Sequence, residues 1–327
     1  MSLLKSIRYK EWLFSKIPLM AVPMLGYIIN SGTTKSSIFM LIQWIIFLIC
    51  FYAFGYIIND YCDREVDKIV GKENSLLEVS KLNASIRVFI VFAVGFFVAI
   101  INHIDVRTLV IITAIYVLGA SYSAKPFRFK EKGILGVIVS SFAQRSMPLI
   151  LLISYINIDL FDLILWMLLG FLVGLRYILI HQYMDLNNDL ESGVETFLTK
   201  RTLNVEPIIK AILIIELIIV IVFGCVYSNM IVFSFVSLVY AIQMYFSFLT
   251  VHKIYKENYW CSYICVPMED YYNFYLPVIW MINLVFANGY WSILIFLFTL
   301  SMLPILKKKV EIPIFYFKCK GWKKWTR

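Results

Sequence analysis

Long apolar stretches alternate with polar or charged connections along most of the chain. Their length suits helices that cross a membrane, because a transmembrane helix needs about 20 predominantly apolar residues. The last two stretches are short and would also fit a hairpin or one tilted span, so the pattern predicts nine or ten spans. The predicted spans lie at 13–31, 37–58, 86–102, 107–123, 134–155, 159–181, 207–226, 230–250, 274–288 and 290–306.

The composition favours the same class of protein. Hydrophobic residues make up 61% of the chain and charged residues 16%, whereas soluble domains average about 45–50% apolar and about 25% charged residues. These values exclude an ordinary soluble domain and a disordered chain. We therefore predict an all-α fold, a polytopic transmembrane helical bundle. No linker divides the sequence, so we expect a single membrane-embedded domain over 1–327, in which 307–327 form a basic cytoplasmic tail.

The formal net charge is +9, and the basic residues are unevenly placed. Most of them lie in the connections after the second, fourth, sixth and eighth predicted spans and at the two ends, whereas the opposite side carries only Lys35. Basic loops favour the cytoplasmic side of a membrane. We expect a multi-pass protein of the bacterial cytoplasmic membrane, with termini and long loops in the cytoplasm. The excess charge then faces anionic lipid, and we expect no nucleic-acid partner.

An acidic cluster follows the second predicted span. It reads Asn-Asp-Tyr-Cys-Asp-Arg-Glu-Val-Asp over 59–67. On a helix, Asn59, Asp63 and Asp67 stand at i, i+4 and i+8 and share one face. Like charges at this spacing repel each other, so a helix that carries them is stabilised by a cation on that face.

A second acidic cluster follows the sixth predicted span. Asp185 and Asp189 again stand at i and i+4, with Asn188 beside them. Oxygen ligands without nearby His or Cys suit Mg²⁺, which commonly shares its coordination shell with substrate phosphates. Two such faces across a cavity would hold a diphosphate through Mg²⁺. The alternative is a pair of solvated loops whose acids balance nearby lysines, but the matching Asp-x-x-x-Asp spacing favours a site.

A basic segment follows the fourth predicted span and reads Tyr-Ser-Ala-Lys-Pro-Phe-Arg-Phe-Lys over 122–130. Cations are needed where a diphosphate leaves, because they stabilise the charge that develops on it. Lys125 and Arg128 suit this role. The alternative is an ordinary positively charged cytoplasmic loop.

At these residues the chain resembles the UbiA family of intramembrane prenyltransferases. The family's Asn-x-x-x-Asp-x-x-x-Asp motif is matched at 59–67, its Asp-x-x-x-Asp motif with a following Gly at 185–193, and its Tyr-Ser-x-Lys-Pro-x-Arg segment at 122–128. The resemblance covers about residues 10–300. It departs from many members at 72–76, which lack an Arg-Pro-rich stretch, and at Asn187, where Glu is common. Both departures bear on the subfamily and hence on the acceptor.

The resemblance implies an Mg²⁺-dependent enzyme that transfers an isoprenyl group from an isoprenyl diphosphate to a small or lipid-like acceptor within the membrane. The diphosphate would ionise with help from Lys125 and Arg128, and the allylic cation would alkylate the acceptor. Tyr122 would stabilise that cation with its ring, or would simply anchor the chain at the membrane interface. The implied metal ligands are Asn59, Asp63, Asp67, Asp185 and Asp189, and the implied substrate-binding residues are Arg64, Lys68, Ser123, Asn188 and Arg145.

Several ionisable residues lie within predicted spans, among them Lys16, Arg145, Arg176 and Glu216. Such groups are costly at membrane depth and usually face a cavity or each other. Arg145 and Arg176 are candidates for an acceptor pocket, or one of them is a structural partner of Glu216. We expect Lys16, near the end of the first span, to extend its ammonium group to the interface.

Two other functions remain open. A membrane terpene cyclase of the same family would use the same diphosphate site without an acceptor. A cation transporter would use the acidic clusters as ion sites, but transport sites lie near the middle of the membrane, whereas both clusters here lie at span ends.

Overall fold

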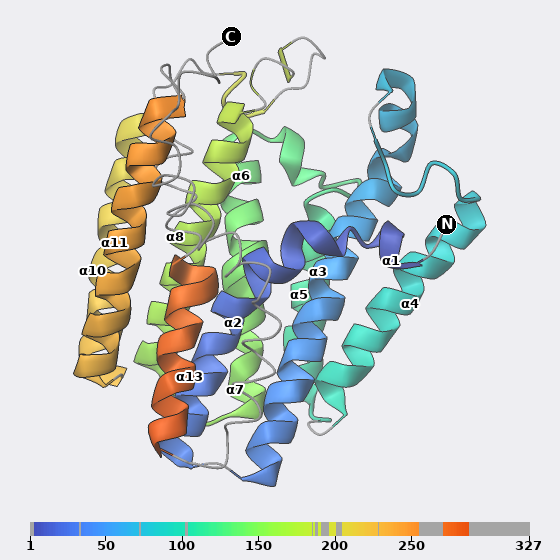
Figure 1. The fold of residues 1–327 in the computed structure, drawn as a ribbon. Helices are drawn as coiled ribbons and strands as arrows, with labels where there is room; N and C mark the ends of the chain where they lie inside the picture. Colours follow the sequence, from blue (N-terminus) through green and yellow to red (C-terminus); the bar gives the residue numbers. More distant parts are fainter. Residues whose placement is uncertain are drawn as a thin grey trace. The chain divides into compact units, whose positions relative to one another are not determined.

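The computed structural model describes residues 3–32, 34–71, 73–101, 104–184, 186, 189–190, 196–200, 205–227, 229–254 and 271–287. The regular secondary structure within these residues is entirely helical (Figure 1). Among these described residues, six helices are long and apolar enough to cross a membrane, and the shorter apolar helical segments Val106–Ser121 and Met230–Ile242 join them. The prediction of an all-α membrane bundle is confirmed.

The chain divides into two compact units, Met1–Tyr27 with Thr34–Val220, and Ile28–Thr33 with Ile221–Arg327. Helix α10 begins in the first unit and ends in the second. The elements up to that point are α1 (Leu3–Ser6), α2 (Tyr9–Ser31), α3 (Lys35–Val70), α4 (Lys81–Ile100), α5 (Val106–Ser121), η1 (Phe129–Glu131), α6 (Ile134–Ser141), η2 (Phe142–Ser146), η3 (Met147–Leu151), α7 (Leu152–Tyr155), α8 (Leu160–Met184) and α10 (Glu206–Tyr227).

The second unit contains α11 (Met230–Ile254), η4 (Tyr271–Tyr275) and α13 (Leu276–Ala287). The rings of Tyr271 and Tyr275 lie 4.8 and 5.1 Å from that of Tyr240 on α11. These aromatic contacts join α11 to the segment that leads into α13.

The first nine predicted spans each coincide with described helices, and the tenth, 290–306, lies outside the described residues. The fifth is not a uniform helix, because 134–155 passes from α-helix through the π-helical η2 and the 3₁₀ segment η3 to α7. Two glycines of α8 allow it to approach this irregular stretch. A Cβ at Gly170 would lie 2.5 Å from the carbonyl oxygen of Arg145, and one at Gly174 would lie 2.9 Å from that of Ser141.

Helix α3 extends well beyond its apolar run. It begins at a capping box between Thr34 and Ser37 and ends at Gly71, whose φ of 69° suits glycine. Its 36 residues span about 54 Å at the usual rise, against a hydrocarbon core of about 30 Å. The segment 59–70, which follows the predicted span, is therefore ordered helix, and α4 runs alongside α3 (Figure 1).

Candidate active site

Asn59, Asp63 and Asp67 lie on the continuous helix α3, as their spacing predicts, and other segments of the chain contact each of them. Asn59 Oδ1 accepts a hydrogen bond from Ser123 Oγ at 2.7 Å. Asp67 Oδ2 accepts one from Asn74 Nδ2 at 2.7 Å. The first acidic motif therefore presents a row of oxygen atoms on one helix face, held by the basic segment on one side and by the connection after α3 on the other.

Asp63 lies between these two residues and is buried. Arg128 Nη2 lies 3.1 Å from its Oδ1 atom, and Lys130 Nζ forms an ion pair with its Oδ2 atom. The structure thus brings the predicted Arg128 to the acidic face, together with Lys130, which the sequence motif does not include. Lys125 is exposed to solvent.

A left-handed backbone conformation explains why Lys130 reaches Asp63. Arg128 adopts φ 37° immediately before the 3₁₀ turn η1. The amide of Arg128 donates to the carbonyl of Ala124 at 2.8 Å, and the amide of Lys130 donates to that of Tyr122 at 3.1 Å. These bonds fold the basic segment back on itself, so that two of its cations meet one carboxylate.

Acidic residues of both motifs act electrostatically on the phenol of Tyr122. Burial raises the pKa of its phenol, a hydrogen bond with Ser140 opposes this, and the negative charges of Asp63 and Asp189 raise it further. The phenol therefore stays protonated, and its hydroxyl is available as a hydrogen-bond donor.

The second motif is only partly described. Asp189 lies within the described residues, whereas Asp185, Asn188 and Gly193 lie outside them. In the described part of the chain, no three His, Cys, Asp or Glu side chains gather into a group that would hold a metal. The ligand set of five residues therefore stays a prediction, and Asn59, Asp63 and Asp67 are the three of its members that one described helix face presents.

A network of polar side chains extends from Tyr122, which forms a hydrogen bond with Ser140. Ser140 accepts a hydrogen bond from Gln144 Nε2 at 2.7 Å, and Gln144 Oε1 accepts one from Lys16 Nζ at 2.5 Å. Lys16 is 3% exposed. The expectation that its ammonium group extends to the interface is wrong, because a side-chain amide and aromatic rings receive it in the interior.

Three tyrosine rings surround this ammonium group. Lys16 Nζ lies 5.0 Å from the ring centroid of Tyr56, 5.4 Å from that of Tyr52 and 6.0 Å from that of Tyr177. Tyrosine faces attract cations, most strongly where water is excluded. Tyr52 also donates to the carbonyl of Gln144 at 2.7 Å, so the rings and the amide are held as one cluster.

The other buried ions separate into two arrangements. Arg176 and Glu216 form an ion pair at 2.9 Å with both side chains fully buried, which is the structural pairing that the sequence left open for one arginine. Arg145 is 1% exposed and donates from Nη2 to the carbonyl of Ser15 at 3.0 Å. Its assignment to substrate binding stays a prediction.

Comparison with known proteins decides the family. The model of the UbiA prenyltransferase family matches residues 19–276, a range that contains all three motifs. The chain belongs to the UbiA prenyltransferase family. No curated protein sequence matches it significantly.

Solved structures of UbiA proteins share the fold at low sequence identity. A UbiA homologue from Aeropyrum pernix K1 superposes with a TM-score of 0.59 at 14% identity, over 87% of this chain and 98% of the other. A homologue from Archaeoglobus fulgidus bound to GPP and Mg²⁺ gives 0.57 at 17% identity, over 86% and 99%. A digeranylgeranylglyceryl phosphate synthase gives 0.56 at 15% identity, over 88% and 98%.

Two predicted substrate-binding residues of this UbiA protein lie away from the acidic face. Arg64 Nη2 donates to the carbonyl of Val79 at 2.5 Å, and Lys68 is exposed. Both follow the motif aspartates by one position, which turns them about 100° around α3. Their role in substrate binding stays a prediction.

Asp60 is an acid whose role the sequence analysis missed. It is 1% exposed, its Oδ1 atom lies 3.1 Å from Arg8 Nη1, and its Oδ2 atom accepts from the amide and hydroxyl of Ser75 at 3.1 and 2.5 Å. The carbonyl oxygen of Ser6 lies 2.9 Å from the same Ser75 hydroxyl and shares its single proton with Asp60. Asp60 therefore ties the N-terminal segment and the connection after α3 to the helix that carries the site.

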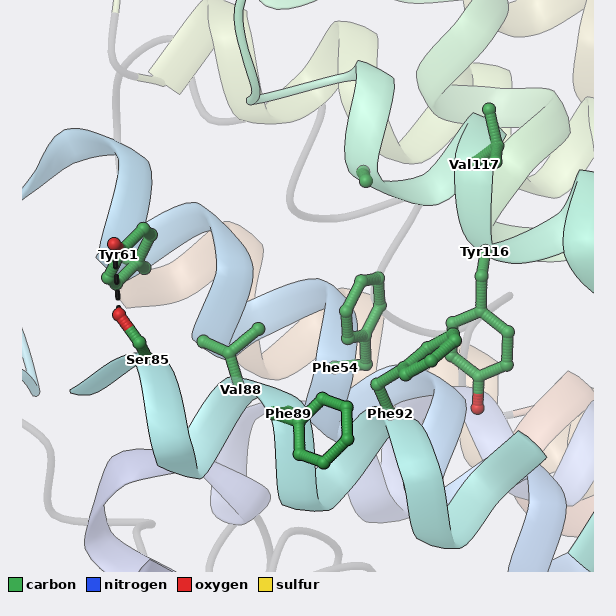
Figure 2. A pocket seen from close by; sticks show the side chains of 9 residues that line it. Phe54, Tyr61, Ser85, Val88, Phe89, Phe92, Tyr116 and Val117 are labelled. Carbon is green, nitrogen blue, oxygen red and sulfur yellow. Dashed lines mark hydrogen bonds between the residues drawn. The ribbon is translucent and has the colours of Figure 1, made fainter. Parts of the chain in front are cut away.

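A cavity of about 400 Å³ lies on another side of α3. Figure 2 shows Phe54, Phe92 and Tyr116 along it, with the hydrogen bond between Tyr61 and Ser85 at one end. Phe54 and Tyr61 are seven residues apart and share a face roughly opposite to that of the acidic motif. The cavity is therefore separate from the acidic site.

Proposed function

We propose that this protein transfers an isoprenyl group from an isoprenyl diphosphate to a small or lipid-like acceptor within the membrane, in a reaction that depends on Mg²⁺. The observation that carries the proposal is the convergence of the basic segment on Asp63, in a member of the UbiA prenyltransferase family. A structural homologue bound to GPP and Mg²⁺ supports the same donor class and the same metal.

The residues that would hold Mg²⁺ are the five of the two acidic motifs. The described members fit this ion, because Asn59, Asp63 and Asp67 supply only oxygen donors on one face. Bound Mg²⁺ would supply Lewis-acid chemistry and neutralise diphosphate charge. Ser123 would keep the Asn59 amide oriented through the bond it already makes.

The basic segment would act on the leaving group. Arg128 would donate hydrogen bonds to the departing diphosphate, and Lys125 would add a positive charge from the exposed part of the segment. Tyr122 would face the allylic cation, and its phenol, kept protonated, would be a much weaker nucleophile toward that cation than a phenolate. The apolar interior would exclude water from the cation.

The buried polar network favours transfer over cyclisation. A cyclase has to wrap one apolar chain, whereas Ser140, Gln144 and Lys16 form a chain of polar side chains that starts at Tyr122. Polar groups at this position suit an acceptor with a polar end. Arg145, from the same π-helical segment as Gln144, is the further residue we assign to that acceptor.

The experiment is an assay of purified protein in lipid nanodiscs with isoprenyl diphosphates of different chain length and an extract of host membrane lipids. We expect Mg²⁺-dependent release of diphosphate and a lipid that mass spectrometry shows to be heavier by the isoprenyl group. Asp63→Ala and Asp185→Ala should abolish both, whereas Glu73→Ala, an exposed acid near the same helix end, should not.

The outcomes separate the alternatives. A hydrocarbon or alcohol formed from the diphosphate alone would support the cyclase instead. If Asp63→Ala turned over substrate at the wild-type rate, the assignment of Asp63 to the site would be wrong. If the wild-type protein consumed no isoprenyl diphosphate in the presence of Mg²⁺, the proposed reaction would be wrong.

A further inference from the structure

Each carboxylate oxygen of Asp63 forms an ion pair with a cationic side chain of the basic segment. Arg128 faces Oδ1, and Lys130 faces Oδ2. The two cationic side chains are 16% and 19% exposed and the carboxylate is 12% exposed. Ion pairs shielded from water to this extent are stronger than surface pairs, because the effective dielectric constant is lower.

Lys130 contacts this carboxylate, whereas the nearby Lys132 does not. Lys130 lies in the turn η1, where its backbone amide donates a hydrogen bond to the carbonyl of Tyr122 and its side chain forms the ion pair with Asp63 of α3. Lys132, two residues further on, is exposed and places its ammonium group 5.0 Å from the ring centroid of Phe129. The contact with Asp63 is therefore specific to Lys130 and is not shared by the neighbouring lysine Lys132.

This arrangement conflicts with the role assigned to Asp63 as a metal ligand. A carboxylate oxygen that accepts a hydrogen bond from an ammonium group has less electron density to offer a divalent cation, and two positive charges in contact with it repel a third. The ion pair of Asp63 with Lys130 and its coordination of a divalent cation therefore compete.

We propose that Lys130 is a resident counter-ion of Asp63, which leaves the carboxylate when the metal site fills and then binds the diphosphate. The inference rests on the proposed function. It gives one lysine two partners in turn, Asp63 in the unloaded protein and a diphosphate oxygen in the loaded one. A freed ammonium group beside a newly arrived anion has a favourable second partner, so the exchange leaves no buried charge uncompensated.

The exchange has a consequence that a purely structural lysine would not have. Removing Lys130 should strengthen divalent-cation binding, because a competitor is lost, and should weaken turnover, because a diphosphate ligand is lost. A lysine that only stabilised the fold would lower both.

The test measures Mn²⁺ binding to the purified full-length protein without substrate, by electron paramagnetic resonance of free Mn²⁺. We expect Lys130→Gln to bind Mn²⁺ at least threefold more tightly than wild type and to turn over an isoprenyl diphosphate at least tenfold more slowly at saturating Mg²⁺. Lys132→Gln is the matched control for the loss of one charge two residues further along the same connection and should leave both unchanged. Lys130→Arg keeps the cation and should bind Mn²⁺ as weakly as wild type.

Mn²⁺ affinity of Lys130→Gln equal to or below that of wild type would overturn the inference, even where turnover of the wild type supports the proposed function. A gain that persists in the Asp63→Asn background would overturn it as well, because the competition is assigned to that carboxylate. A wild-type protein that binds no Mn²⁺ and turns over no isoprenyl diphosphate would overturn the proposed function instead.

Discussion

Asp60 and Asp63 are three residues apart on one helix and do different work. Asp60 holds Arg8 and Ser75 and is almost fully buried, whereas Asp63 receives the cations of the basic segment. Residues three apart on a helix lie on adjoining sides of it, so the difference arises from the segments that each acid meets. Asp60 contacts the N-terminal segment and the connection after α3, whereas Asp63 contacts the basic segment. We therefore assign a structural role to Asp60 and a role in the chemistry of the site to Asp63.

Asp60→Asn should destabilise the protein while leaving the acidic face in place. The amide keeps the shape of the carboxylate but loses the ion pair with Arg8 and one of the two acceptor oxygens, at a site that is 1% exposed. Loss of a buried, charge-assisted bond of this kind costs about 1–3 kcal/mol. Thermal unfolding in detergent should show a lower midpoint than wild type, and Glu78→Gln, at an exposed position of the same connection, should not. Equal midpoints for all three proteins would show that Asp60 is not a structural residue.

The register of the acidic face could be predicted from sequence because it is local to one helix. Spacing alone places Asn59, Asp63 and Asp67 on one face, and the structure confirms that they lie on a continuous helix. The contact of Lys130 with Asp63 could not be predicted in this way. It depends on the left-handed turn at Arg128, and no hydrophobic period in the sequence signals that turn.

At the scale of elements, the two glycines of α8 set the position of the segment that carries Gln144 and Arg145. Gly170 faces the carbonyl of Arg145 so closely that a Cβ atom would lie 2.5 Å from it. The partner atom belongs to the backbone, so a rotamer change cannot relieve the clash. The inner polar network therefore depends on a helix-to-helix distance that only glycine permits.

Gly170→Ala should separate α8 from the π-helical segment and lower stability by about 1–3 kcal/mol, as overpacking does. Gly55→Ala is the matched control, because nothing lies within 4 Å of a Cβ at that position of α3. Alanine is the better helix former by up to about 1 kcal/mol, so the control should be neutral or stabilising. Unfolding midpoints in detergent measure both, and a Gly170→Ala protein as stable as Gly55→Ala would contradict the close approach.

At the scale of the whole chain, the sequence was most informative where the membrane imposes the structure. Lipid leaves backbone groups no partner other than the helix itself, so long apolar runs become helices almost without exception. The irregular stretch 142–151 was not predicted, since its apolar composition is that of an ordinary span. Likewise, hydropathy could not indicate that Lys16 turns inward, because its three tyrosine partners come from two other helices.

The sidedness of the membrane follows from the same charge pattern and is the remaining prediction. Helix α3 is continuous from Lys35 to Val70, and its length exceeds the hydrocarbon core, so its two ends lie on opposite sides of the membrane it crosses. The positively charged connections adjoin the end that carries the acidic motif, which we assign to the cytoplasm.

Accessibility of single cysteines in membrane vesicles measures this sidedness. In a background without the six native cysteines, Glu73→Cys should react with a membrane-impermeant maleimide only in inside-out vesicles, and Ser36→Cys only in right-side-out vesicles. Both positions are exposed, so a cysteine that does not react is shielded by the membrane and not by burial in the protein. The reverse pattern would place the diphosphate site on the outer face, and reaction of both positions in one vesicle type would show that α3 does not cross the membrane.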